Sequence, residues 1–427
     1  MKNEVILLKI TKQKGTKDIY FDDMKVWQFI EKNIREIAKV YNLGEIRTPV
    51  FEATELFQRG VGDETDVVNK EMYTFLDKGS RSITLRPELT AGVVRAYIEN
   101  GFASEVTPLK FWYASNMYRY EKMQKGRYRE FKQFGVEIFG SDRYLADLEA
   151  IMISRDLFKR IGMLDLVELN INSIGCKECR AKYIEALKEY IKPNIDNMCD
   201  TCKRRFDTNP MRIIDCKEEK CQSYLQNVPY ITDYLCDACK LDFDNLKYAL
   251  ENSNIPYKVD KRIVRGLDYY NRTVFEYTSD KLGLALGGGG RYDTLVETLG
   301  GSHTPAVGFG LGLDRIELVL KENNIYKDNN DNLDVFFAVM VDEAYPKILN
   351  IIQDLRNDDI PSEYDICKRS FKAQLKYANK QNAKFVAIIG EDELKNNKCS
   401  IKNMETGNQE LIDLNKDSIK NYLENNI

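Results

Sequence analysis

The chain has 427 residues, of which 43% are hydrophobic and 30% charged, and its formal net charge at pH 7 is −4. This balance is typical of a globular protein with two or three domains, and it leaves any nucleic-acid contact to local basic patches. No apolar run approaches the roughly 20 residues of a membrane span, and Met1–Ile10 lacks the features of a secretory signal. We therefore expect a cytoplasmic protein without a membrane partner.

The first ninety residues predict a helix, a short strand and a second helix. Apolar residues from Val26 to Val40 recur at helical spacing and indicate a helix with one buried face. The segment Gly44–Phe51 predicts a short strand, in which Pro49 favours a sheet edge or an interface. The turn Arg86–Gly92 contains a proline near a predicted helix start at Val93, so its polar side chains are free to reach a pocket.

A hairpin with a basic loop is predicted next. Leu109–Met117 reads as a buried strand, residues 119–129 as a basic loop, and Phe131–Phe139 as the returning strand. Strand alternation places Gln133 and Glu137 on one face together with aromatic residues and a glycine, as a pocket for a small polar ligand requires. A solvated hairpin explains the loop arginines but not these two polar residues.

Eight of the ten cysteines lie within a small insertion domain that we predict at residues 173–258. They form three Cys-x-x-Cys pairs and one pair with a four-residue gap, namely Cys176 and Cys179, Cys199 and Cys202, Cys216 and Cys221, and Cys236 and Cys239. Eight thiolates suffice for two tetrahedral zinc sites, whereas disulfides are disfavoured in a reducing cytosol. Unligated buried thiols are the alternative. The pairing stays open, although we favour sites built from two pairs.

The stretch Arg265–Glu276 is too polar for a core strand and too aromatic for a linker. It predicts a strand lining a pocket, with Arg265 facing an anion and Tyr269 and Tyr270 enclosing a small ligand. The alternative is a strand with one face exposed to solvent. The glycine-rich segment Gly283–Gly290 follows, and it lets the backbone approach a flat or phosphorylated ligand.

The end of the chain predicts a separate α/β domain. Gly308–Leu320 reads as a strand entering an apolar helix, and Asn323–Asn332 as a polar linker. Beyond it, strands and helices alternate in a pattern typical of a sheet with parallel strands. The predicted elements are the strands Val335–Val341 and Phe385–Gly390 and the helices Tyr345–Asn357 and Phe371–Asn382.

These motifs resemble those of the class II aminoacyl-tRNA synthetases, and closely those of the bacterial histidyl-tRNA synthetases. The Pro49 segment is similar to the first motif of the class, Phe111–Glu137 to the second and Ala306–Arg315 to the third. The segments Thr84–Thr90 and Arg265–Glu276 match the two stretches that mark the histidine-specific members.

The resemblance implies an α+β fold and a two-step reaction. We expect a six-stranded antiparallel catalytic sheet flanked by helices over residues 1–325, interrupted by the insertion domain, and a C-terminal anticodon-binding domain over 333–427. The implied enzyme is a homodimer that activates L-histidine with ATP and Mg²⁺ to histidyl-adenylate and pyrophosphate. It then transfers histidine to the 3′ end of tRNA(His).

The resemblance also assigns roles to individual residues. Arg119 and Arg265 are the implied catalytic residues at the α-phosphate. The implied ATP-binding residues are Arg119, Glu121, Arg127 and Arg315. The implied histidine-binding residues are Glu88, Leu89, Thr90, Arg119, Gln133, Glu137, Arg265, Tyr269 and Tyr270, with Glu137 and Tyr270 at the two imidazole nitrogens.

Five positions depart from the bacterial pattern: Leu89, Lys122, Met123, Lys132 and Asp314. Asp314 stands where a longer glutamate is usual, which shortens a carboxylate expected near magnesium. Two other functions compete with the ligase. A catalytically inactive paralogue that regulates ATP phosphoribosyltransferase usually lacks the anticodon domain and the Arg265 segment. A general RNA-binding protein explains the basic loop but not an imidazole-sized pocket.

A lysine-rich stretch in the last domain is a candidate tRNA contact. Six basic residues and no acidic ones lie between Lys368 and Lys384, and Lys372, Lys376 and Lys380 share one helical face. Phosphate contacts from this face are one interpretation, and a merely solvated face is the other.

Overall fold

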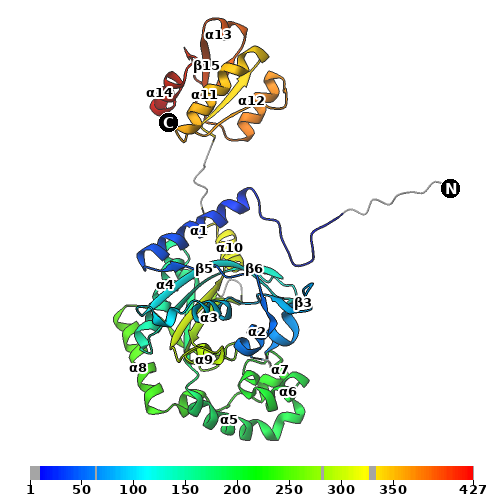
Figure 1. The fold of residues 1–427 in the computed structure, drawn as a ribbon, viewed down its shortest axis with the longest axis vertical. Coiled ribbons are helices and arrows are strands. Elements are labelled where there is room, and N and C mark those ends of the chain that lie inside the picture. Colours follow the sequence, from blue (N-terminus) through cyan, green and yellow to red (C-terminus); the bar gives the residue numbers. More distant parts are fainter. Residues whose placement is uncertain (1–9, 63–64, 280–282, 327–332, 427) are drawn as a thin grey trace, which may run out of the picture. The chain divides into compact units, whose positions relative to one another are not determined.

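The computed structural model describes residues 10–62, 65–279, 283–326 and 333–426. The chain divides into two compact units, Met1–Lys327 and Asp328–Ile427 (Figure 1). Two segments discussed above lie partly outside the described residues: residues 1–9 of Met1–Ile10, and residues 327–332 of the predicted linker. Among the described residues, no helix combines the length and the apolar character that crossing a membrane requires.

The first unit is organised around a sheet of eight strands. Six of them are antiparallel, as the resemblance implied, and each outermost strand runs parallel to its neighbour. In spatial order the strands are β1 (Gly44–Glu45), β5 (Leu109–Tyr118), β6 (Glu130–Phe139), β11 (Ala306–Gly312), β10 (Leu284–Arg291), β9 (Asn271–Ser279), β7 (Glu168–Ser173) and β8 (Lys258–Val259).

Helices cover both faces of this sheet. The α-helices outside the insertion are α1 (Asp22–Val40), α2 (Thr54–Val61), α3 (Thr90–Glu99), α4 (Tyr144–Arg160), α9 (Leu295–Thr298) and α10 (Leu313–Glu322). A second, three-stranded sheet consists of β2 (Phe51–Ala53), β4 (Ser82–Leu85) and β3 (Tyr73–Leu76), with a π-helix at Val67–Glu71.

Strand alternation divides the buried side chains between the two faces. Phe134, Val136 and Ile138 of β6 pack with α1, α4 and α10 in one core cluster, while Phe139 packs with α3 in another. The predicted face of β6 that carries Gln133 and Glu137 is therefore the α3 face. The hydrophobic pattern sets this orientation, because a shift of one residue would turn every side chain to the other face.

Three predicted elements need correction. Val40 is 64% exposed, because α1 ends there and its buried stripe stops at Ala38. The predicted strand Gly44–Phe51 is two short strands, β1 and β2, which belong to different sheets, and Pro49 lies in neither. Residues 265–270 form a loop before β9 rather than part of the strand.

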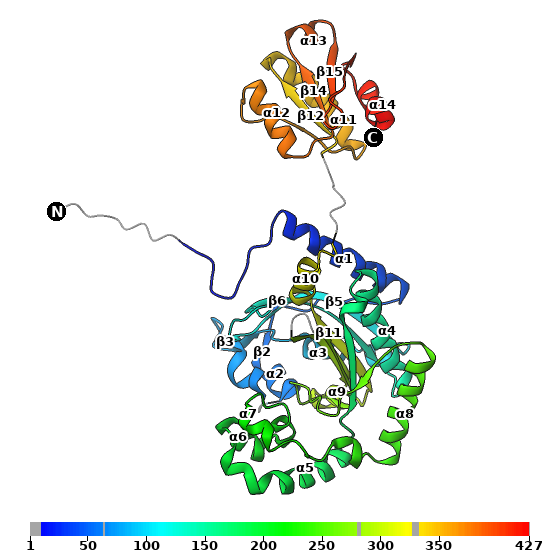
Figure 2. The ribbon, with the colours of Figure 1, turned by 180° about the vertical axis from the view of Figure 1, so that it is seen from behind.

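The cysteine-rich segment is helical and lies at one end of the first unit (Figures 1 and 2). Its helices are α5 (Lys177–Ile191), α6 (Asp200–Thr208), α7 (Glu219–Ser223) and α8 (Asp237–Asn252), with 3-10 helices that include Pro210–Ile213. The buried cysteines contribute to its core together with leucine, isoleucine and tyrosine side chains.

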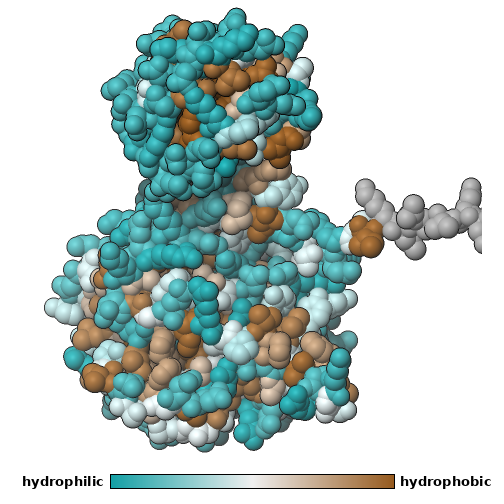
Figure 3. Space-filling model, turned by 45° about the horizontal axis from the view of Figure 1, so that its top comes forward, coloured by the Kyte–Doolittle hydropathy of each residue, from teal (hydrophilic) through white to brown (hydrophobic). Residues whose placement is uncertain are grey.

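The second unit has a sheet of its own with the predicted parallel strands. Its order is β13 (Ser362–Tyr364), β12 (Val335–Val339), β14 (Phe385–Ile389), β15 (Lys398–Asn403) and β16 (Gln409–Asp413), of which the first three are parallel. The helices are α11 (Tyr345–Asn357), α12 (Phe371–Lys380), α13 (Glu391–Lys395) and α14 (Lys416–Asn426). On the face drawn in Figure 3, hydrophobic residues of both units lie among hydrophilic ones.

Candidate active site

A cavity of about 960 Å³ lies over β5, β6, β10 and β11 on the α3 face of the large sheet. Its walls come from segments far apart in the sequence: the turn before α3, the basic loop between β5 and β6, the 265–270 loop, the start of α10 and the insertion. The close packing of β10 helps to shape the floor. A Cβ on Gly288 would lie 2.2 Å from the Phe275 carbonyl and 2.9 Å from Arg265 Nη1, so only glycine fits there.

One end of the cavity carries a buried carboxylate, Glu137, that is surrounded by hydroxyl groups. Thr90 Oγ1 and the Tyr113 hydroxyl donate to Glu137 Oε1 over 2.7 and 3.1 Å, and the Tyr292 hydroxyl donates to Oε2 over 2.5 Å. Gly308 leaves room for this group, since a Cβ there would lie 1.8 Å from Glu137 Oε2. Thr90 and Tyr113 line the cavity, whereas Glu137 lies behind them.

Burial controls the protonation of the acids at this end. It raises the pKa of Glu137 to about 8, although the bonds from Tyr292 and Thr90 oppose the shift. Burial also raises the pKa of Glu88, against the bond from the Ala91 amide. Glu88 Oε1 accepts that amide over 3.0 Å, but Oε2 is buried without a hydrogen-bond partner and faces the cavity. A cationic group of a ligand would satisfy it.

Arg265 lines the cavity and contacts both Glu276 and the ring of Tyr270. Its Nη1 donates to Glu276 Oε2 over 2.9 Å, its guanidinium lies 5.5 Å from the Tyr270 ring centre, and its Nε is buried without a partner. Tyr269 and Tyr270 stack at a tilt with their ring centres 4.6 Å apart and are almost fully buried. The loop thus presents two aromatic rings and one cation to the cavity. The Nε of this cation, Arg265, has no partner and is available to an anion.

Arginines line the part of the cavity that is here called its cationic end, and the charge of one of them, Arg119, also acts on Glu88. Arg119 Nε donates to the Pro87 carbonyl over 2.7 Å, and Arg315 Nε donates to the Gly126 carbonyl over 3.1 Å. Arg119 Nη1 and Arg127 Nη1 lie 3.7 and 3.4 Å from the two carboxylate oxygens of Glu121. Burial and then the neighbouring Arg127 charge lower the pKa of Arg315. Crowded guanidinium groups of this kind favour a polyanionic ligand.

The departures from the bacterial pattern mostly lie beside the cavity. Asp314 is engaged already, because Lys17 Nζ lies 2.8 Å from Oδ1 and the Lys132 amide donates to Oδ2 over 2.8 Å. Lys132 Nζ pairs with Glu31 over 2.6 Å. Asp314 therefore holds the N-terminal segment and β6 against α10, a structural use that was not expected.

The structure brings eleven of the twelve residues implied for histidine and ATP to this one cavity, with Glu137 behind its wall. The eleven are Glu88, Leu89, Thr90, Arg119, Glu121, Arg127, Gln133, Arg265, Tyr269, Tyr270 and Arg315. Sequence reasoning missed Tyr113, Tyr292, Glu276 and Arg212. Only Tyr113 had a usable signal, since it faces Gly135 across the β5–β6 hairpin.

The eight cysteines of the insertion gather into two groups. The first cysteine cluster is Cys176, Cys179, Cys236 and Cys239, and the second cysteine cluster is Cys199, Cys202, Cys216 and Cys221. The sulfur atoms of each cluster lie within 4.8 Å of one another. The Cys176–Cys179 and Cys199–Cys216 sulfur pairs are 3.5 and 3.8 Å apart.

The cysteine clusters have the geometry of tetrathiolate metal sites. Tetrahedral zinc with Zn–S bonds of about 2.3 Å places its sulfurs about 3.8 Å apart, close to the separations seen here. The Cys236 amide donates to Cys179 Sγ over 3.1 Å and the Cys199 amide to Cys221 Sγ over 3.2 Å. Such bonds stabilise thiolates, so the residues present fit zinc in both clusters.

Taken together, an antiparallel sheet, a cavity with cations at one end and carboxylates at the other, and a separate α/β domain define a class II aminoacyl-tRNA synthetase. The family model of histidyl-tRNA synthetase matches residues 15–316, and that of the anticodon binding domain matches residues 334–426. The chain belongs to the histidyl-tRNA synthetase family.

Similarity to known proteins extends along the whole chain. The histidine–tRNA ligase of Acetivibrio thermocellus is 51% identical over 94% of this chain and 96% of its own length. That of Clostridium perfringens is 50% identical over 97% of this chain and 100% of its own. The crystal structure of the apo histidyl-tRNA synthetase of S. aureus superposes with a TM-score of 0.81 at 38% identity, covering 98% of this chain and 100% of that one.

Proposed function

We propose that this chain is a histidine–tRNA ligase that uses L-histidine, ATP and tRNA(His). The observation that carries the proposal is the position of Arg265, which shares one cavity with the buried Glu88 and with Arg119 and Arg315. The carboxylate of an amino acid and the α-phosphate of ATP would meet at that point. The extent of the similarity to curated ligases supports the same conclusion.

In the first step, a carboxylate oxygen of histidine attacks the α-phosphorus of ATP, and pyrophosphate leaves with the electrons of the broken P–O bond. Charge accumulates on the α-phosphoryl oxygens, so positioning and cationic donors dominate catalysis. Arg119 and Arg265 would stabilise this negative charge. A hydrogen bond to the Pro87 carbonyl holds Arg119 in place, and a hydrogen bond to Glu276 holds Arg265. In the second step, the 3′-terminal hydroxyl of tRNA attacks the histidyl carbonyl and releases AMP.

Recognition of histidine would use the buried end of the cavity. Glu88, together with Thr90 and Gln133, would hold the ammonium group, since Glu88 Oε2 lacks a partner. Tyr270 would meet one imidazole nitrogen. Glu137 would act on the other through the Thr90 and Tyr113 hydroxyls that it organises. Polar groups left unpaired by any other amino acid can give discrimination of about 10⁴–10⁵, which makes a separate editing site unnecessary.

The triphosphate would lie at the arginine end. Arg127 and Arg315 would bind phosphate oxygens, and Leu89 and Tyr269 would close the wall between ATP and histidine. Mg²⁺, when bound with ATP, neutralises phosphate charge. Both oxygens of Asp314 are engaged by Lys17 and by the Lys132 amide, and both oxygens of Glu121 lie 3.4–3.7 Å from arginines, so either carboxylate would have to exchange a partner to meet such an ion.

The remaining assignments concern the domains, the oligomeric state and the cysteine clusters. We assign residues 1–325 to the catalytic domain, 173–258 to an insertion domain within it, and 333–427 to the anticodon-binding domain of a cytoplasmic homodimer. We also assign a zinc ion to each cysteine cluster. Zinc would stabilise the insertion by joining the short helices α6 and α7 to the rest of its core, to which the buried cysteines already belong. Metal analysis of protein purified without added zinc should give two ions per chain, and eight freely titrating thiols would contradict the assignment.

Histidine-dependent exchange of radiolabelled pyrophosphate into ATP tests the proposed function. The ligase exchanges label only when histidine is present. A regulatory paralogue without catalysis and a general RNA-binding protein give no exchange, and the paralogue would instead alter ATP phosphoribosyltransferase. Charging of tRNA(His) with labelled histidine then tests the second step, for which an uncharged tRNA of different specificity is the control.

A further inference from the structure

The second cysteine cluster encloses the part of the insertion that touches the active site. Its ligand pairs, Cys199 with Cys202 and Cys216 with Cys221, flank residues 203–215 on both sides. This segment contains most of α6 and the 3-10 helix Pro210–Ile213. Cys216 itself lines the active-site cavity, next to Asp215 and close to Arg212. The first cysteine cluster contributes none of its cysteines to that lining in the described part of the chain.

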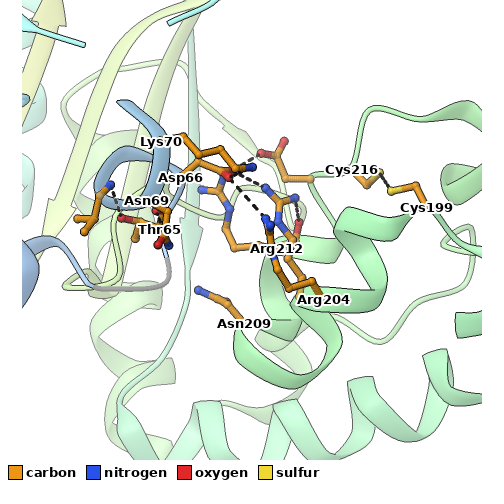
Figure 4. A network of polar contacts seen from close by, with 12 residues as sticks. Thr65, Asp66, Asn69, Lys70, Cys199, Arg204, Asn209, Arg212 and Cys216 are labelled. Carbon is orange, nitrogen blue, oxygen red and sulfur yellow. Dashed lines mark hydrogen bonds and ion pairs between the residues drawn. The ribbon is translucent and has the colours of Figure 1, made fainter. Parts of the chain in front are cut away.

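A chain of hydrogen bonds leads from this segment to Arg265. Arg205 Nη2 donates to Asp66 Oδ2 over 2.9 Å, and Arg205 Nη1 donates to the Arg212 carbonyl over 3.0 Å. Arg212 Nη1 in turn donates to the Arg265 carbonyl over 2.8 Å. Figure 4 shows Asp66 and Arg212 of this network together with Cys199 and Cys216 of the second cysteine cluster. The insertion thus holds the backbone of the residue placed at the α-phosphate.

Arg212 is well suited to positioning. Its side chain is mostly buried, and its Nη1 is fixed by the bond to the Arg265 carbonyl. Its Nη2 lies as far as 3.9 Å from Asp215, a weak ion pair that cannot fix it alone. Gly266 brings the loop backbone close, since a Cβ there would lie 3.4 Å from Arg212 Nη1. The orientation of Arg212 therefore depends on how the second cysteine cluster joins the two ends of residues 203–215.

We infer that a metal ion held by the second cysteine cluster positions the active site, because it fixes Arg212, and Arg212 fixes the backbone of Arg265. The inference rests on the proposed function and deepens it. Arg212 is a positioning residue in this scheme. Displacement of a catalytic group by about 1 Å can cost 10²-fold in rate, so loss of the ion is expected to lower kcat while the histidine pocket stays intact.

Two single variants and their combination test the inference in full-length enzyme. Arg212→Met removes the bond to the Arg265 carbonyl. It should keep both zinc ions and lower kcat of pyrophosphate exchange roughly 10- to 100-fold, with the KM for histidine changed by less than about twofold. Cys221→Ser, which does not touch the cavity, should lose one zinc ion and lower kcat by a similar factor. Because both act through one contact, the double variant should be no slower than Cys221→Ser.

Cys239→Ser in the first cysteine cluster is the matched control. It also removes one zinc ligand, but it leaves the second cluster and the Arg212 contact in place. Arg212→Met should therefore have its full effect in the Cys239→Ser background. Multiplicative effects of Arg212→Met and Cys221→Ser, or a KM for ATP that rises while kcat holds, would overturn the positioning role.

These experiments also distinguish failure of this inference from failure of the proposed zinc site or of the proposed ligase activity. Wild-type enzyme that exchanges pyrophosphate but contains no metal overturns the metal part alone, and metal without exchange overturns the ligase. If Cys221→Ser does not fold, Arg212→Met with full zinc content decides the matter by itself: a wild-type kcat overturns the inference. Arg212→Lys, which keeps one donor, should recover part of the lost rate.

Discussion

The two ends of the active-site cavity are built in different ways. At the histidine end, both oxygens of Glu137 are occupied by hydroxyls of buried residues, and the group is closed to solvent. At the proposed ATP end, Arg315 donates to the Gly126 and Ala285 carbonyls, and Arg119 donates to the Pro87 carbonyl. Under the proposed function, selectivity for the imidazole ring would come from a polar network that is already hydrogen-bonded, whereas binding of the triphosphate would come from crowded cations whose mutual repulsion the ligand relieves.

The largest expected effect is at the junction of the two ends. Arg265→Ala removes a cation that faces charge growing in the transition state, so kcat should fall by about 10²–10³. Pyrophosphate exchange at saturating substrates measures this. Arg81→Ala, at an exposed turn between β3 and β4, is the control and should behave as wild type. A variant that changes only the KM for histidine would place Arg265 at the histidine end instead.

Glu137→Gln tests whether the histidine end depends on the buried network. The substitution keeps the shape but replaces one acceptor oxygen by an amide donor, which cannot accept from Thr90 and Tyr113 or from Tyr292 as the carboxylate does. We expect kcat/KM for histidine to fall roughly 10- to 100-fold while the KM for ATP stays unchanged, since a buried polar group left without its partner costs ~1–3 kcal/mol. An equal loss for both substrates would erase the distinction between the two ends.

Arg315→Met is the corresponding test at the ATP end. Loss of one charge-assisted contact should raise the KM for ATP about 10-fold and leave the KM for histidine as it was. Lys125→Met is the matched control, because Lys125 lies next to Gly126, whose carbonyl Arg315 binds, but pairs with Glu322 over 2.6 Å. A histidine defect in Arg315→Met would show that the two ends are coupled.

The same contrast predicts a pH dependence of stability. The pKa of Glu137 is raised to about 8 in the folded chain, so the folded state binds more protons than the unfolded state between the ordinary glutamate range and pH 8. Stability contributed by protonated Glu137 is thus present at low pH and lost as pH rises towards 8. The fall in Tm from pH 5 to pH 8 should be smaller in Glu137→Gln than in wild type. Identical slopes would contradict the shift.

The smallest effect is expected where charges are fully solvated. Lys372, Lys376 and Lys380 of α12 are exposed and form no ion pair within the described residues. If they contact tRNA phosphates, replacing all three by Met should make the slope of log Kd against log salt shallower by up to ~3. The matched control replaces Lys395, Lys398 and Lys416, each paired with an acid. An unchanged slope leaves α12 as a solvated face.

Local pattern was enough to predict most elements, while the resemblance to a known family implied most of the residues that line the cavity. The alternation of Phe131–Phe139 correctly placed Gln133 and Glu137 on one face, because side-chain direction in a strand repeats every two residues. The cysteine pairs could also be recognised from the sequence, since the two cysteines of each pair are separated by only two or four residues. These features depend on neighbours in the sequence, so the sequence by itself determined them.

Tertiary structure alone decided how those pieces meet. The sequence could not say that Cys199 and Cys202 share a cluster with Cys216 and Cys221, or that the 265–270 segment is a loop. Nor could it reveal that Arg212 holds the Arg265 carbonyl across the insertion. Such contacts join residues tens of positions apart, and their existence depends on strand register and on the packing of the insertion against the sheet, for which local periodicity contains no information.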